Sequence, residues 1–367
     1  MNILIVGPIK PFRGGIAHSN EILSKNLSKK HKVINISFKR LFPKVFYPGK
    51  FQIAYKENNG TLDSINPMNW IFEKKKFKKA DIVIFQWWTT FLFPCFYYLA
   101  TKTKVKKIAL CQNIFPHSEG ILKFIVNPLN KILTKIFLSK MDRLVAMSNS
   151  DKKLLIKMFP KKEIGLYFEP MYDLPGIKNG NPTKQEAKNK LGLKNKTMLF
   201  FGFVREYKGL KYLIEAMPEI VKKTQAELII VGEFWENKEK YEEVIKSKGI
   251  EKKVRIIDEY IPDKEISNYF IGSDLLVLPY ISISESGVIR MAFNFNIPIL
   301  STKVGGNPDH IENGVNGFLV GPKNPKALAQ KATEFFTQNL YSKLSKGMAK
   351  KRKDLEWSNI KEKELLG

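Results

Sequence analysis

The stretch LPYISISESGVIRMAFNFNIPIL, residues 278–300, contains a strand, a turn, a helix and a second strand in immediate succession. An apolar run ends at Pro279, a serine- and glycine-rich turn follows, and a helical pattern from Val288 to Phe295 leads into an apolar run at Pro298–Ser301. This order predicts one repeat of a parallel beta-alpha sheet. In such sheets ligands bind outside the carboxyl ends of the strands, which is where the turn falls.

The same alternation extends through both halves of the chain, and short, nearly all-apolar strands are typical of parallel sheets covered on both faces. In the first half we expect strands at Ile3–Gly7, Val33–Phe38, Ile82–Phe85, Lys107–Cys111 and Arg143–Met147. In the second half we expect strands at Met198–Phe201, Glu227–Val231, Val254–Ile257, Leu275–Leu278 and Pro298–Ser301. The sequence therefore predicts an α/β protein with two Rossmann-like, doubly wound domains facing each other across a cleft.

The length of 367 residues fits two domains of ordinary size. The periodicity lapses in PMYDLPGIKNGNP, residues 170–182, which we interpret as the linker. We expect an N-terminal domain at 1–175, a C-terminal domain at 183–345 and a final segment at 346–367.

The composition is that of a folded globular protein, with 44% hydrophobic and 26% charged residues. Cys95 and Cys111 are too few for a disulfide framework and suit a reducing compartment. The N-terminal MNILIVG lacks the features of a signal peptide. The uncharged segment 82–100 is long enough to span a bilayer, but its polar centre and Pro94 favour a buried strand followed by a loop and helix.

The net charge of +27 is concentrated in the first half of the chain. Residues 1–180 hold 31 Lys and Arg against 11 Asp and Glu, a net charge of +20. Such a field attracts an anionic partner, namely nucleic acid, an anionic bilayer or a phosphate-bearing substrate. The alternative is that lysine-rich faces only keep the protein soluble, which is the usual interpretation of a single run such as 73–79.

Two further motifs follow strands and point to phosphate binding. Gly14-Gly15 opens a helix after the first strand, although a plain tight turn is as typical of this spacing. Arg205 and Lys208 follow the strand that ends at Gly202 and precede a helix. Two cations beside a helix N-terminus form a good diphosphate site, whereas the alternative is two solvated surface charges.

Taken in order, the second-half motifs resemble glycosyltransferase family 4, the group 1 nucleotide-sugar glycosyltransferases of the GT-B fold. They are FGFVREYKGL, ELIIVGEFW, DEYIPDKEI, DLLVLPY, SGV, PILSTKVGGNPDHIENGVNGFLV and DLEWS. The resemblance implies an acceptor-binding N-terminal domain, a donor-binding C-terminal domain and a retaining transfer without a metal ion or cofactor. It also implies that the last helix returns to the first domain.

The resemblance assigns roles to individual residues. The catalytic residues implied by the resemblance are Arg205, Lys208 and His117. The alternative for His117 is an ordinary loop histidine. The acceptor side would hold His18, Gln112 and Asn113. The donor side would hold Gly14, Gly15, Gly202, Glu233, Ile261, Glu285, Ser286, Gly287 and Val288, with the helix start at Ser286 donating N–H groups to the diphosphate.

This sequence also departs from the family pattern. Ile283 and Met291 stand where many relatives have two glutamates, so Glu285 is the expected substitute. Phe203 stands where an arginine is common, which makes Arg205 its replacement, and Gln112 stands where a strand-end histidine is common. These differences leave open the donor's identity and a second hypothesis, a GT-B protein that binds sugar nucleotides without turnover.

The acceptor is expected at a membrane. In residues 120–140 apolar residues recur at helical spacing with lysines between them, which suits either a bilayer interface or packing on the sheet. The leading hypothesis is a hexosyltransferase-like enzyme that acts on a saccharide or lipid-linked saccharide at the cytoplasmic face of the cell membrane, in polysaccharide or glycolipid synthesis. A basic nucleic-acid-binding protein is the weaker rival, since the sequence contains no familiar nucleic-acid module.

Overall fold

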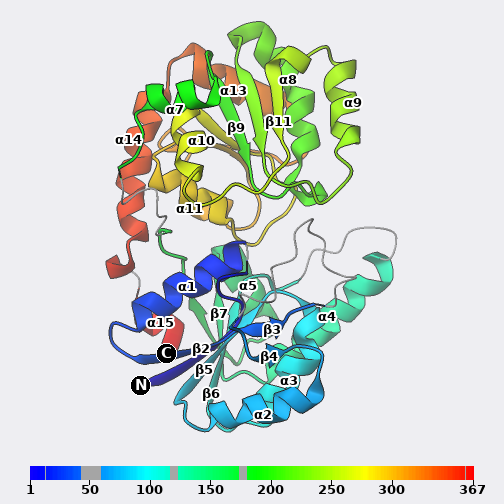
Figure 1. The fold of residues 1–367 in the computed structure, drawn as a ribbon, viewed down its shortest axis with the longest axis vertical. Helices are drawn as coiled ribbons and strands as arrows, with labels where there is room; N and C mark the ends of the chain where they lie inside the picture. The colour runs from blue at the N-terminus through cyan, green and yellow to red at the C-terminus, as the bar shows by residue number, and fades with distance from the viewer. Residues whose placement is uncertain (13, 43–58, 116–122, 173–179, 360) are drawn as a thin grey trace. The chain divides into compact units, whose positions relative to one another are not determined.

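The computed structural model describes residues 1–12, 14–42, 59–115, 123–172, 180–359 and 361–367. The chain divides into two compact units, Met1–Pro170 with Ile360–Gly367, and Met171–Asn359. Each unit contains a six-stranded parallel sheet. Figure 1 shows helices on both faces of each sheet.

In the first unit the strand order is β2-β1-β5-β6-β7-β8. The strands of this sheet are β1 Asn2–Val6, β2 Lys32–Ile36, β5 Ile82–Trp87, β6 Lys106–Cys111, β7 Arg143–Ala146 and β8 Glu163–Leu166. A small parallel pair, β3 Phe38–Arg40 and β4 Leu62–Asp63, lies beside it. The helices are α1 Gly15–Leu27, α2 Pro67–Phe77, α3 Phe93–Thr101, α4 Lys123–Ser139, α5 Asn149–Met158 and α15 Glu362–Leu366.

In the second unit the order is β11-β10-β9-β12-β13-β14. The strands are β9 Thr197–Phe201, β10 Glu227–Val231, β11 Val254–Ile257, β12 Leu275–Leu278, β13 Ile299–Thr302 and β14 Gly317–Val320. The helices are α7 Lys184–Leu191, α8 Leu210–Thr224, α9 Glu239–Ser247, α10 Ile266–Gly272, α11 Gly287–Asn294, α12 Asn307–His310, α13 Pro325–Thr337 and α14 Tyr341–Arg352.

The two sheets follow the same general path, although one strand lies beyond the starting strand in the first sheet and two lie beyond it in the second. The chain starts in an inner strand, moves outward to one edge and then returns past its start to build the other side. The direction reverses between β1 and β5 in the first unit and between β9 and β12 in the second. Because the loops after these neighbouring strands diverge, this switch point is the usual ligand position in open parallel sheets.

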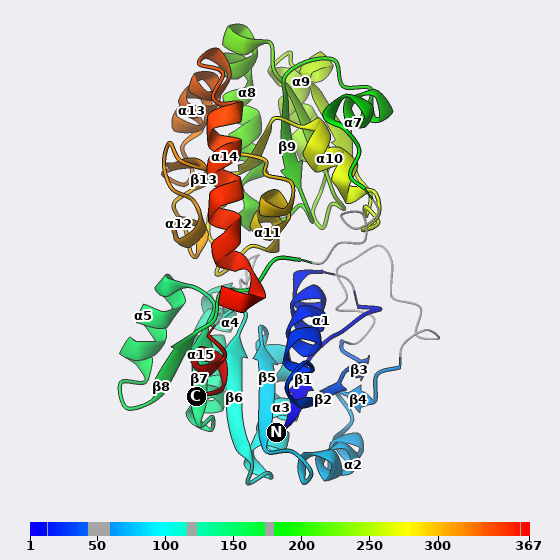
Figure 2. The ribbon, with the colours of Figure 1, turned by 90° about the vertical axis from the view of Figure 1, so that its left-hand side faces the viewer.

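Buried apolar side chains cover one face of the first sheet under α2, α3, α4 and α5. Figure 2 shows α1 and α15 on the opposite face. The segment 82–100, which is long enough to span a bilayer, is divided into β5, a short 3-10 turn and α3. Among the described residues no helix has the length and apolar character needed to cross a membrane.

The end of the chain differs in detail from the expected boundary at residue 346. Helix α14 and two 3-10 turns stay with the second unit as far as Asn359, and only the last residues join the first unit. Arg143 donates to the carbonyl oxygen of Glu364 (3.0 Å), and Lys106 donates to that of Leu366 (2.7 Å). These bonds attach α15 to the amino-terminal ends of β6 and β7.

Candidate functional site

Three predicted site residues meet at the switch point of the second sheet. Gly202 follows β9 with a φ of 99°. A Cβ placed on it would lie 2.9 Å from Nζ of Lys208 and 3.7 Å from Cγ2 of Val288 at the start of α11. Only glycine leaves room for the ammonium group here, because any side chain would push Lys208 away. The backbone of β9 thus brings a cation and a helix start together.

The loops after β9 and β10 are joined to each other. Val204 N donates to Glu233 O (2.9 Å), and Trp235 N donates to Val204 O (3.1 Å). Arg205 follows directly, with its guanidinium 5.5 Å from the ring centroid of Trp235 and 5.4 Å from that of Tyr207. Aromatic faces hold a guanidinium in place without neutralising it. Arg205 is therefore positioned by contacts with both rings.

Lys208 is more enclosed than a surface cation. It ends the 3-10 turn Glu206–Lys208, is 7% exposed and has its Nζ 5.9 Å from the ring centroid of Tyr280. Burial, reinforced by the charge of Arg205, lowers the pKa of Lys208 to about 7. An anion bound beside the amine favours the charged form, so anion binding and protonation of Lys208 reinforce each other.

Helix α11 begins at Gly287, and Ser286 is its N-cap residue without a side-chain capping bond. Instead, the Ser286 hydroxyl lies 3.4 Å from that of Tyr280. The first backbone N–H groups of a helix have no partner within the helix and favour anions. A Cβ placed on Gly287 would lie 2.3 Å from the Tyr172 hydroxyl, so glycine at this position leaves room for Tyr172.

Glu285 faces the protein interior. Its side chain is 5% exposed and accepts from Nη2 of Arg290 (3.3 Å), while Nε2 of His310 lies 3.2 Å away. Although burial raises the pKa of a carboxyl group, the charges of His310 and Arg290 hold the pKa of Glu285 below its ordinary value. Burial and the charge of Arg290 lower the pKa of His310, and Nη2 of Arg290 lies 3.0 Å from Nε2 of its ring. Glu285 is thus part of a buried cluster and does not occupy the ligand-facing position expected of a substitute glutamate.

The remaining donor-side candidates lie on neighbouring loops. Glu233 follows β10 and is 5% exposed; Ile261 lies beyond β11 and is 7% exposed. Phe234 N donates to the carboxylate of Asp258 (2.9 Å), which connects these two loops. Gly305 has a structural role, because a Cβ there would lie 1.7 Å from Ile283 O.

The first unit carries a different set of groups at its own switch point. Gly14 has a φ of 107° and precedes α1, which begins at Gly15. His18 is half-buried in the first turn of that helix. A positive φ of this size is rarely adopted by residues with side chains, so the turn requires glycine at position 14.

Gln112 is buried in a neutral hydrogen-bond network. Its Nε2 donates to Oε1 of Gln86 (2.9 Å) and to Oγ of Ser19 (3.1 Å). Asn20 of α1 donates to Pro8 O (2.8 Å) in the same region. Asn113 follows Gln112 and is half-buried, whereas His117 lies outside the described residues.

Sequence reasoning missed the partners that hold these candidates in place. They are Ser19, Gln86, Tyr172, Tyr280, Arg290 and His310. Arg290 lies on an apolar helix and is fully buried, which is unusual for a charged residue without a buried partner. An arginine at an inward position of α11 was therefore an available signal for a carboxylate nearby. Tyr172 and His310 gave no comparable signal.

The described residues hold no cluster of three or more His, Cys, Asp or Glu side chains suited to a metal ion. Cys95 and Cys111 are buried free thiols, and burial raises the pKa of both. An un-ionised thiol is a poor nucleophile, so neither cysteine is a candidate for catalysis.

Comparison with solved structures defines the fold. The structure of Anabaena HepE in complex with UDP-glucose has a TM-score of 0.76 at 15% identity and covers 99% of this chain and 98% of that one. The lipopolysaccharide outer core galactosyltransferase WaaB has a TM-score of 0.67 at 16% identity, with 98% and 96% covered. The fold is that of the GT-B glycosyltransferases.

Comparison with known sequences identifies similar proteins in the second half of the chain. Residues 182–354 match the sequence model of the glycosyl transferases group 1. An uncharacterized glycosyltransferase of Methanocaldococcus jannaschii is 30% identical over 134 residues, which are 36% of this chain and 34% of that protein. The chain thus spans about a third of the length of this curated relative. The resemblance to group 1 glycosyltransferases seen in the motifs is confirmed.

Proposed function

We propose that this protein is a retaining glycosyltransferase that moves a sugar from a nucleoside diphosphate sugar to a saccharide or lipid-linked saccharide. The observation that carries the proposal is the meeting of Gly202, Lys208 and the start of α11 at the switch point of the second sheet. A cation beside unpaired helix N–H groups suits a diphosphate. The occurrence of UDP-glucose in a protein of the same fold supports this ligand class.

In this proposal the donor diphosphate binds to Lys208, Arg205 and the N–H groups that open α11. As the bond between the sugar carbon and the phosphate oxygen breaks, negative charge accumulates on that oxygen. Preorganised cations and N–H donors stabilise such charge, and they supply what a divalent cation supplies in other transferases. No metal ion or other cofactor is therefore part of the proposal.

Retention follows if the acceptor hydroxyl attacks the face that the leaving group departs from. The hydroxyl oxygen forms the new bond to the sugar carbon, and its proton passes to the phosphate oxygen that leaves. All atoms balance without an enzyme nucleophile. Gln112 and Asn113 follow β6 in the first unit, where neutral hydrogen-bonding groups suit sugar hydroxyls. We assign these residues and His18 to the acceptor side.

The acceptor is proposed to be presented at the cytoplasmic face of a cell membrane, in the synthesis of a surface polysaccharide or glycolipid. Support comes from the charge asymmetry, because the first 180 residues carry 31 Lys and Arg against 11 Asp and Glu. A basic surface favours an anionic bilayer. We expect no nucleic acid partner.

Differential scanning fluorimetry with UDP, GDP, ADP and CMP tests the donor half of this proposal. One nucleotide should raise the melting temperature, since a ligand present at 100 times its Kd stabilises by about 2.7 kcal/mol. The matching UDP-, GDP- or ADP-sugar should then release free nucleotide faster when acceptors are added. No thermal shift with any nucleotide would contradict the proposal.

A second candidate is a protein that binds sugar nucleotides without transferring the sugar. The burial of Glu285 against Arg290 and His310 favours it, because that carboxylate is used internally. The same assay separates the two functions. A binding protein shows the thermal shift without nucleotide release, whereas the transferase shows both.

A further inference from the structure

Two helices of the first unit expose rows of large apolar side chains on one face of the sheet. Eleven large hydrophobic side chains are exposed among the described residues, and seven belong to α4, to α2 or to the loop before α2. They are Ile65, Met68, Ile71, Phe72, Leu129, Ile132 and Ile136. Such clustering differs from scattered single residues, which are normal on any surface.

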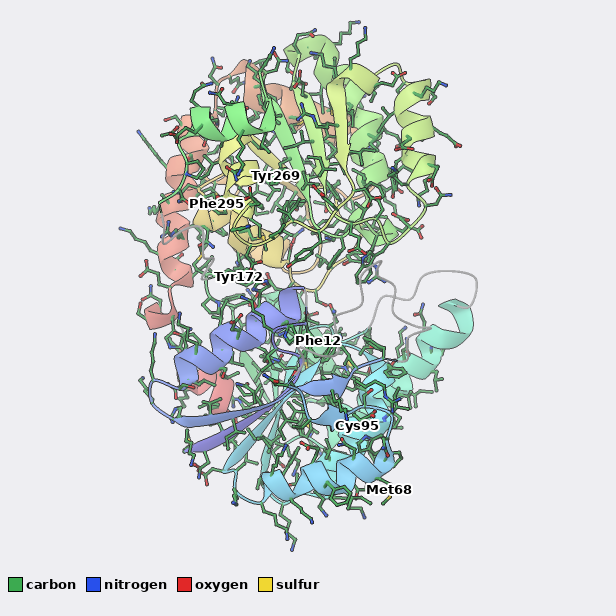
Figure 3. All side chains as sticks on the ribbon, in the orientation of Figure 1. Phe12, Met68, Cys95, Tyr172, Tyr269 and Phe295 are labelled. Atoms are coloured by element: carbon green, nitrogen blue, oxygen red, sulfur yellow. The ribbon has the colours of Figure 1, made fainter. Side chains whose placement is uncertain are left out.

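The apolar row on α2 is opposite to its buried side. Met68, Ile71 and Phe72 are 61%, 46% and 59% exposed, while Trp70 and Phe77 pack inward. Figure 3 shows Met68 on the outer side of α2. Spacings of three and four residues place the exposed side chains on one side of the helix.

Helix α4 has apolar side chains both against the sheet and on its exposed side. Phe137 and Leu138 are buried against the sheet, but Leu129, Ile132 and Ile136 are 52%, 56% and 39% exposed. The helix therefore has an apolar side for the sheet and a second apolar row facing outward. Helix α3 contacts both α2 and α4, so the three helices form one layer.

Lysines flank both apolar rows with little acidic compensation. Exposed lysines are Lys75, Lys76, Lys78 and Lys79 at α2, and Lys131, Lys135 and Lys140 at α4. The one acidic residue of α2, Glu73, is buried and paired with Lys76 (2.8 Å), and residues 123–140 contain none. Lys75 Nζ lies 5.4 Å from the ring centroid of Phe72, so charge and apolar surface alternate over short distances.

We propose that this face, defined by Met68, Ile71 and Phe72 of α2 with Leu129, Ile132 and Ile136 of α4, docks on an anionic lipid bilayer. A bilayer interface takes up apolar side chains and offers phosphates to the lysines around them. A second copy of the chain is a poor occupant, because its lysines would meet those of the first copy. This inference rests on the proposed function, because docking on a bilayer would give the transferase access to a lipid-linked acceptor.

Vesicle flotation of the full chain tests the proposal. We expect binding to vesicles of phosphatidylcholine with 30% phosphatidylglycerol, and weaker binding in 0.5 M NaCl, because salt screens the lysines. The double variants I71S/F72S and I132S/I136S should each reduce the bound-to-free ratio about tenfold. The matched control I34S/V315S removes two exposed apolar side chains elsewhere and should leave the ratio unchanged.

Three results would overturn the proposal: equal flotation of the I71S/F72S variant and the wild type, equal binding to pure phosphatidylcholine, and binding to duplex DNA or to an acidic protein in place of vesicles. Circular dichroism confirms that each variant is folded, and the exposed sites make unfolding unexpected. The nucleotide thermal shift distinguishes the two proposals. Vesicle binding without any nucleotide shift would sustain the docking face and contradict the proposed enzyme, whereas the reverse would contradict the docking face alone.

Discussion

At the carboxyl edges of the two sheets, the side chains that follow the strands differ in charge. In the first unit, Gln112 after β6 belongs to a neutral hydrogen-bond network and donates to Gln86 and Ser19. In the second unit Lys208 lies close to Gly202 at the switch point, with Arg205 on the same loop. The fold therefore provides the location of a site, and the side chains decide whether it suits a neutral sugar or a diphosphate.

Replacing Glu285 by Gln should have the largest effect. The change leaves the charge of Arg290 buried without its carboxylate, which costs about 3 kcal/mol or more in the free energy of unfolding. Urea unfolding measures this cost. The control Glu219→Gln removes an exposed carboxylate paired with Lys223 and should change stability by less than about 0.5 kcal/mol. Equal stabilities of the two variants would show that the buried cluster is not needed by the second unit.

Replacing Gln112 by Leu tests the neutral edge. The side-chain oxygens of Gln86 and Ser19 would lose a buried donor, so we expect a loss of about 2 kcal/mol in the free energy of unfolding. Gln185 on α7 is exposed, and Gln185→Leu serves as the control. If Gln112→Leu left the free energy of unfolding unchanged, the first unit would tolerate an apolar side chain in this hydrogen-bond network. The contrast between a polar network in the first unit and cations in the second would then be lost.

Replacing Lys208 by Ala should lower turnover about tenfold or more, because a cation that stabilises the leaving diphosphate is lost. Nucleotide release at saturating donor measures the effect. The control is Lys211→Ala, since Lys211 is 65% exposed and pairs with Glu215 on α8. Unchanged turnover in a folded Lys208→Ala variant would exclude the proposed role of Lys208 in stabilising the leaving diphosphate.

The smallest expected effect is a pH dependence caused by Lys208. The pKa of Lys208 is about 7 in the folded protein, whereas an unperturbed lysine has a pKa of 10.5. Between pH 7 and pH 10.5 the unfolded chain therefore binds a proton at Lys208 that the folded protein has largely released. The contribution of Lys208 to stability therefore rises with pH, by about 1 kcal/mol between pH 7 and pH 8. Comparing urea unfolding of the wild type and Lys208→Met at both pH values isolates this term. Identical pH dependence in the two proteins would show that Lys208 is not desolvated.

Much of the second unit was predictable from local pattern. The expected strands at residues 227–231, 254–257 and 275–278 coincide with β10, β11 and β12, because buried parallel strands are short apolar runs. Strands β8 and β14 were missed, since each is a four-residue edge strand containing glycine, Gly165 or Gly317. Short segments of this kind gain their structure from pairing with a neighbour rather than from periodicity.

The sequence by itself determined the alternation of strands and helices, the two-domain organisation and the positions of glycines and cations at strand ends. Only the tertiary structure decided which of those polar groups pair with other buried side chains of the protein. Glu285 contacts Arg290 of α11 and His310 of α12. Glycine at position 287 leaves room for Tyr172. The physical reason is that periodicity records local burial, whereas the partner of a buried charge is set by contacts between residues distant in sequence.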